Sequence, residues 1–105
     1  MYIARYLNTV WERGLEQVVG AIIKVIGDVQ GVGFRMIVKR WASEFRLGGY
    51  VRNIPDGSVE IYVEGPRYLI DRFTETLKLE SPTQILDIEV KYTNPRGFKE
   101  FYIVP

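Results

Sequence analysis

The residues with the clearest capacity for chemistry lie in a short glycine-rich segment, residues 27–35. Glycine lets the backbone approach a ligand closely, and the start of a helix offers unpaired N–H groups and a partial positive charge to an anion. Arg35 falls in the expected first turn of that helix, where its charge is unfavourable unless an anion occupies the loop. Its guanidinium could then bind a phosphate through two parallel hydrogen bonds. The segment therefore indicates an anion site, although a tight strand-to-helix connection would use the same glycines.

Two familiar phosphate motifs do not fit this segment. A P-loop requires Gly-Lys-Ser/Thr, which does not follow here, and the dinucleotide fingerprint would place a glycine at Met36. A metal-chaperone loop would require cysteine, and the chain has none. If the segment binds a ligand, its chemistry is that of backbone N–H groups and one arginine.

Asn53 is the second candidate, and it lies near the end of an expected strand, directly before the turn residues 54–57. An amide is no base at neutral pH, but it accepts and donates hydrogen bonds and can therefore orient a water. Taken alone, the residue is better interpreted as an asparagine that simply opens the turn. Arg52 alternates to the opposite face of the strand, so we expect it to be a solvated or supporting charge.

The other polar and aromatic side chains of these strands have structural interpretations. The carboxylates are expected in the turn and on solvent-facing strand positions, at Asp56, Glu60 and Glu64. Three tyrosines could form a stacking platform for RNA, but we expect them to pack at the edge or on the face of the sheet: Tyr50, Tyr62 and Tyr92.

The composition removes most other catalytic chemistries. The 105 residues include no histidine and no cysteine, which excludes Ser-His-Asp and Cys-His catalysis, disulfides and thiolate metal sites. A net charge of +1 disfavours a nucleic-acid partner. The longest uncharged apolar run, residues 18–23, is too short to cross a bilayer, and the N-terminus lacks a signal-peptide pattern. We expect a cytoplasmic domain without nucleic-acid or membrane partners.

Hydrophobic periodicity predicts strands over 21–26, 50–54, 59–64, 86–92 and 99–104, and helices over 34–45 and 65–78. This order predicts an α+β fold, the ferredoxin-like βαββαβ sandwich. Two helices then cover one face of an antiparallel sheet, and the last segment adds a short C-terminal strand.

Residues 1–20 form an extension before the expected domain, residues 21–105. Apolar residues recur in this extension at helical spacing: Ile3, Leu7, Val10, Trp11, Leu15 and Val18. One interpretation is an amphipathic arm that docks on the domain or on a partner. The other is a frayed tail outside the functional unit.

Two segments together resemble the signatures of the acylphosphatase family. Residues 27–35 match Gly-x-Val-Gln-Gly-Val-Gly-Phe-Arg at every fixed position, and residues 49–53 with Gly57, Val59 and Gly65 match the second signature at the right spacing. The resemblance covers about residues 21–104. It implies a monomeric ferredoxin-like enzyme that hydrolyses the carboxyl–phosphate bond of small-molecule acyl phosphates, releasing a carboxylate and inorganic phosphate, with no metal or other cofactor.

The resemblance also implies roles for the matched residues. Arg35 would bind the phosphoryl group together with the loop amides of Gln30, Gly31, Val32, Gly33, Phe34 and Arg35. Asn53 would position the attacking water. The chain departs from the family at Arg46, where a glycine commonly ends the first helix, and near Ser81, where a glycine is missing. We expect both departures to lie away from the matched catalytic positions.

A non-enzymatic ferredoxin-like module that senses an anion or contacts a partner would show the same loop. Larger hydrogenase-maturation proteins also carry an acylphosphatase-like domain, but the length of this chain favours a stand-alone enzyme.

Overall fold

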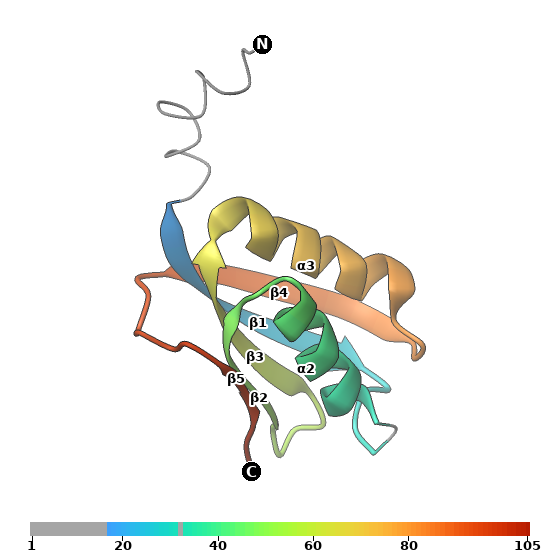
Figure 1. Cartoon of the computed structure of the whole chain (residues 1–105). Helices are drawn as coiled ribbons and strands as arrows, with labels where there is room; N and C mark the ends of the chain where they lie inside the picture. Colours follow the sequence, from blue (N-terminus) through green and yellow to red (C-terminus); the bar gives the residue numbers. More distant parts are fainter. Residues whose placement is uncertain (1–16, 32) are drawn as a thin grey trace.

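The computed structural model describes residues 17–31 and 33–105. In these residues, five strands form one sheet and two helices pack on one of its faces (Figure 1). The elements are β1 (Val18–Gly27), α2 (Phe34–Glu44), β2 (Gly48–Asn53), β3 (Val59–Pro66), α3 (Arg67–Glu80), β4 (Ile85–Thr93) and β5 (Phe101–Ile103). The predicted ferredoxin-like α+β fold is confirmed, including the short C-terminal strand.

The strand order across the sheet is β4-β1-β3-β2-β5. Neighbouring strands are antiparallel except for β2 and β5, which are parallel, so the short C-terminal strand adds a parallel edge to the predicted antiparallel sheet. The reason is the path of residues 94–100, which leave β4 at one edge and reach the opposite edge (Figure 1). β5 therefore starts where β4 ends, and it must run against β4 and along β2.

The core lies between the sheet and the two helices. Alternate strand residues and one stripe of each helix are fully buried there, among them Ile23, Val25, Ile61, Val63, Phe34, Val38, Ile70, Phe73 and Leu77. Phe34, the first residue of α2, is only 1% exposed. Burial of this large aromatic ring is strongly favourable, so it fixes the first turn of α2, which carries Arg35.

The opposite face of β3 is also covered, and the expectation that Glu64 faces solvent was wrong. Tyr62 is 0% exposed and Glu64 only 6%. The segment between β4 and β5 crosses this face, placing the Phe98 ring 5.5 Å from the Tyr62 ring and the Arg96 guanidinium 4.1 Å above it. Tyr50 stacks on Tyr62 with ring centroids 5.8 Å apart, which confirms the predicted sheet-face packing of these two tyrosines.

The Glu64 carboxylate anchors this crossing segment. It accepts hydrogen bonds from the Tyr62 hydroxyl at 2.6 Å and from the main-chain N–H groups of Arg96 and Gly97 at 2.6 and 2.8 Å. Burial acts to raise the pKa of Glu64, but the hydrogen bonds outweigh it and hold the pKa below its usual value. Burial and the neighbouring carboxylate raise the pKa of Tyr62 to about 12.

The end of α2 gives a physical reason for the departure at Arg46. The backbone of Arg46 is left-handed, with φ 59°. Its N–H donates to the Ser43 carbonyl at 3.0 Å, and the Leu47 N–H donates to the Ala42 carbonyl at 2.9 Å. These two bonds make a Schellman motif, whose left-handed position favours glycine because a Cβ is strained there. Arg46 therefore keeps the motif at a cost in backbone strain.

Most element boundaries differ from the sequence prediction by a few residues, and two of the differences, in β1 and β4, have consequences. β1 begins at Val18, so residues 18–20 of the expected extension, residues 1–20, belong to the sheet, and residues 1–16 lie outside the described residues. In β4, Ile85 and Ile88 pack on the core, whereas Leu86 is 71% exposed. The cause is a register shift at Ile26/Gly27 of β1, which pairs Gly27 with Ile85.

Candidate active site

The junction of β1 and α2 forms a loop whose described residues, 28–31 and 33, we call the cradle. Gly31 and Gly33 each have φ 77°, a left-handed conformation that glycine adopts without strain. Gly33 is the N-cap of α2, and among the described residues no side chain caps this helix start. The N–H groups of the first turn therefore keep the free hydrogen-bonding capacity that an anion requires. Val32 lies outside the described residues.

A cavity of about 190 Å³ opens at the cradle. It is lined by Val29, Gly31, Gly33, Phe34, Arg35, Met36 and Ile103. Arg35 is half-buried, and no ion pair joins it to any of the described carboxylates. A guanidinium and the positive end of a helix thus meet in one cavity, which makes this part of the surface suited to a phosphate-sized anion.

The cradle is tied at its start to the loop before β4. The Asp28 N–H donates to the Gln84 carbonyl at 3.0 Å, and the Thr83 hydroxyl donates to the Asp28 carbonyl. We expected the loop around Ser81 to lie away from the matched catalytic positions, but its residues 83 and 84 contact the first residue of the cradle. This loop therefore takes part in holding the site.

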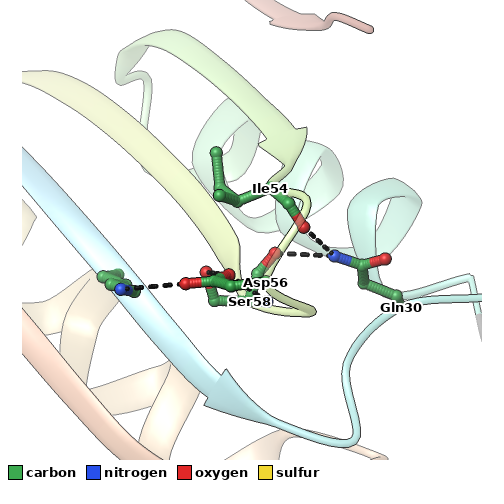
Figure 2. A network of polar contacts seen from close by, with 5 residues as sticks. Gln30, Ile54, Asp56 and Ser58 are labelled. Atoms are coloured by element: carbon green, nitrogen blue, oxygen red, sulfur yellow. Dashed lines mark hydrogen bonds and ion pairs between the residues drawn. The ribbon is translucent and has the colours of Figure 1, made fainter.

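Gln30 ties the cradle to the turn between β2 and β3. Its side-chain Nε2 donates to the main-chain carbonyls of Ile54 and Ser58, both at 2.8 Å (Figure 2). Figure 2 shows this side chain pointing into the turn. Of the groups of Gln30, the backbone N–H therefore remains for an anion, while the side chain positions the loop.

The turn that receives Gln30 is itself held by Asp56. The Asp56 carboxylate accepts hydrogen bonds from the Ser58 hydroxyl at 2.6 Å and the Ser58 N–H at 2.9 Å (Figure 2), and it pairs with the Lys24 ammonium at 3.2 Å. Hydrogen bonds from Ser58, followed by Lys24, lower the pKa of Asp56 to about 2. The expected turn role of Asp56 is confirmed, and it supports the surface on which Gln30 rests.

Asn53 is the last residue of β2, directly before Ile54. Its Oδ1 is buried and has no hydrogen-bond partner among the described residues. Strand alternation places it on the face of the fully buried Val51, which pairs with Ile103 of β5. Asn53 is not among the residues that line the cavity. β1 and β2 finish at the same end of the sheet, so Asn53 and the cradle lie at that end, where Gln30 contacts Ile54.

Arg52 lies on the opposite face, as expected from the alternation. Its guanidinium pairs with Glu60 at 3.2 Å, and the same carboxylate oxygen accepts a hydrogen bond from the Tyr50 hydroxyl at 2.7 Å. Arg52 therefore supports the far face of the sheet and does not share a ligand with Asn53.

Two residues of the cavity were missed by the sequence reasoning, Met36 and Ile103. Met36 directly follows Arg35 and lies outside the apolar stripe of α2, so the sequence could have indicated that it faces the site. Ile103 reaches the cavity because β5 pairs with β2, a long-range contact that carries no local sequence signal.

The fold and the site together define a ferredoxin-like domain with an anion cradle at its first strand-to-helix junction. The family model described as Acylphosphatase matches residues 21–103, so the chain belongs to the acylphosphatase family. An acylphosphatase of Pseudothermotoga lettingae is 41% identical over 85 residues, which cover 79% of this chain and 94% of that relative. Membership places the chain among the acylphosphatase hydrolases.

Solved structures give the same result. The crystal structure of acylphosphatase from Bacillus subtilis matches with a TM-score of 0.80 at 40% identity, covering 83% of this chain and 99% of that chain. A full-length HypF in the phosphate- and nucleotide-bound form matches with a TM-score of 0.78 at 32% identity, covering 86% of this chain but 12% of that chain. Neither helix of the described residues is long and apolar enough to span a membrane.

Proposed function

We propose that this chain hydrolyses acyl phosphates to a carboxylate and inorganic phosphate without a metal ion, acting as a monomer. The observation that carries the proposal is the meeting of Arg35, free of carboxylate ion pairs in the described residues, with the uncapped start of α2 in one cavity. In the proposed complex, the guanidinium and the N–H groups of the cradle and first turn bind the phosphoryl oxygens.

The chemistry of the substrate matches this small set of groups. An acyl phosphate is a mixed anhydride whose leaving group is a carboxylate, a weak base that departs without a general acid. Phosphoryl transfer through a loose transition state requires mainly in-line positioning and stabilisation of charge on the phosphoryl oxygens. Backbone N–H groups and one arginine supply that stabilisation without any protein base.

Asn53 is proposed to position the attacking water. Its buried Oδ1 lacks a protein partner among the described residues, so it is able to accept a hydrogen bond from one O–H of that water. A lone pair of the water oxygen then points toward phosphorus. A bond forms between this oxygen and phosphorus while the bond from phosphorus to the carboxylate oxygen breaks.

The proton of the water is proposed to pass to a phosphoryl oxygen of the substrate itself. The chain has no histidine, and no carboxylate stands at a matched catalytic position. The carboxylate nearest to Asn53 in sequence, Asp56, has a pKa of about 2, so it would be a poor base.

Turnover of acetyl phosphate by the purified full chain, with excess EDTA present, tests the proposal. We expect hydrolysis in the chelator, and a fall in kcat/KM of about 100-fold or more in Arg35→Lys, because a point charge does not replace the planar guanidinium. Arg40→Lys is the matched control, since Arg40 is exposed on the same helix and pairs only with Glu44, at 3.5 Å, among the described carboxylates. A wild-type chain that binds phosphate but hydrolyses nothing would instead be an anion-binding module.

A further inference from the structure

The cavity at the cradle has an apolar side that phosphate binding does not use. Beside Gly31, Gly33 and Arg35, its lining consists of Val29, Phe34, Met36 and Ile103. Among the described residues that line it, Arg35 is the only one with a charged side chain. A phosphoryl group held by Arg35 therefore leaves apolar surface for the rest of the substrate.

Core packing does not explain Met36. The buried stripe of α2 consists of Phe34, Val38 and Ala42, whereas Met36 is 65% exposed. Side chains in a helix lean toward its N-terminus, so Met36 covers the first turn, where the cradle lies. A methionine is flexible and polarisable, and it adapts to apolar groups of different shapes.

Ile103 supplies a second apolar surface, from a different part of the chain. It is half-buried and pairs with Val51 in the parallel ladder of β5 and β2. The following N–H, that of Val104, donates to the Val51 carbonyl at 3.0 Å. Ile103 is therefore fixed by the sheet, whereas Met36 is exposed and adjustable.

We propose that Met36 and Ile103 form an acyl-recognition wall, which makes the enzyme prefer acyl phosphates with an apolar, aromatic or branched acyl group. The inference rests on the proposed function and names its substrate class. An apolar acyl group loses contact with water against this wall, which is favourable. A charged acyl group would meet no charged side chain other than Arg35 among the described lining residues, and its desolvation would go uncompensated.

The same wall favours release of the carboxylate product. Once the bond to phosphorus is broken, the acyl product is a carboxylate. An anion against apolar side chains is poorly solvated, so it leaves for water. The wall therefore favours the bound substrate over the carboxylate product.

The test compares kcat/KM for benzoyl phosphate, 4-carboxybenzoyl phosphate and acetyl phosphate. We expect the wild type to prefer benzoyl over both others. Met36→Gln keeps the length of the side chain and makes it polar, and it should lower the benzoyl-to-acetyl ratio of kcat/KM by about tenfold. Leu86→Gln is the matched control, because Leu86 is 71% exposed and lies outside the cavity.

The outcomes separate the two claims. Hydrolysis of acetyl phosphate with an unchanged benzoyl-to-acetyl ratio in Met36→Gln would overturn the wall and leave the proposed function standing. So would equal kcat/KM for the benzoyl and 4-carboxybenzoyl substrates in the wild type. No hydrolysis of any of the three by the wild type would overturn the proposed function, and the wall with it.

Discussion

The side-chain amide of Gln30 donates a 2.8 Å hydrogen bond to the main-chain carbonyl of Ile54, the residue that follows Asn53. A second bond of the same length reaches the Ser58 carbonyl. One side chain thus joins the loop that is proposed to bind phosphate to the strand end that is proposed to hold the water. The spacing between these two groups depends on it.

Gln30→Ala should therefore lower kcat about tenfold or more with little change in inhibition by inorganic phosphate, because a small displacement of the water from the line of attack is costly. The unfolding free energy should fall by about 1–3 kcal/mol, since two carbonyls lose their donor. Urea unfolding and steady-state kinetics measure the two effects. Gln84→Ala is the control, because Gln84 contacts Asp28 through its main chain. A normal kcat in Gln30→Ala despite the loss of stability would refute the positioning role.

Asn53→Ala should separate stability from activity. The substitution removes a buried acceptor that has no partner among the described residues, so the unfolding free energy should stay within about 1 kcal/mol of the wild type. We expect kcat to fall about 100-fold, with a much smaller effect on the inhibition constant of phosphate. A defect confined to phosphate binding would show that Asn53 binds the anion and does not position the water.

Arg46→Gly should stabilise the protein by about 0.5–1 kcal/mol, because glycine adopts the left-handed backbone of the helix end without strain. Arg40→Gly, in the interior of the same helix, should destabilise it by about 1 kcal/mol. Urea unfolding of both variants measures the difference. We expect changes of opposite sign in the unfolding free energy of the two variants. Destabilisation by Arg46→Gly would show that the Arg46 side chain stabilises the protein by more than its left-handed backbone costs.

Glu64 should make the stability depend on pH in acid. Its pKa is lower in the folded chain than its ordinary value of 4.5, so its contribution is fully present above that value and is lost as the pH falls below it. In Glu64→Gln the unfolding free energy should be lower at pH 7, and it should fall less between pH 5 and pH 3 than in the wild type. Parallel pH profiles for the two proteins would contradict the anchoring of residues 96 and 97 by this carboxylate.

Local patterns were sufficient to predict much of the fold and the cradle. The period of the apolar residues predicted the helix that begins at Phe34, and the glycines before it indicated a strand-to-helix loop, in which Gly31 and Gly33 have positive φ angles. Both depend on interactions within a few residues, which a sequence shows directly. The turn at Asp56 was predictable for the same reason.

Contacts between distant segments were not predictable in this way. Glu64 alternates as a solvent-facing residue would, and only the crossing of residues 94–100 buries it. Likewise, Gln30 is bound by carbonyls 24 and 28 residues away. Ile103 reaches the cavity through the parallel pairing of the last strand. These features depend on chain topology, and no local sequence pattern predicts them.

Hydrolysis of acetyl phosphate in ¹⁸O-labelled water, with excess EDTA, tests the central claim most directly. The proposed geometry holds the phosphoryl group in the cradle and directs the water at phosphorus, so the label should enter inorganic phosphate and the released acetate should stay unlabelled. Label in the acetate would mean that water attacks the carbonyl carbon, and it would contradict the roles proposed for Arg35 and Asn53.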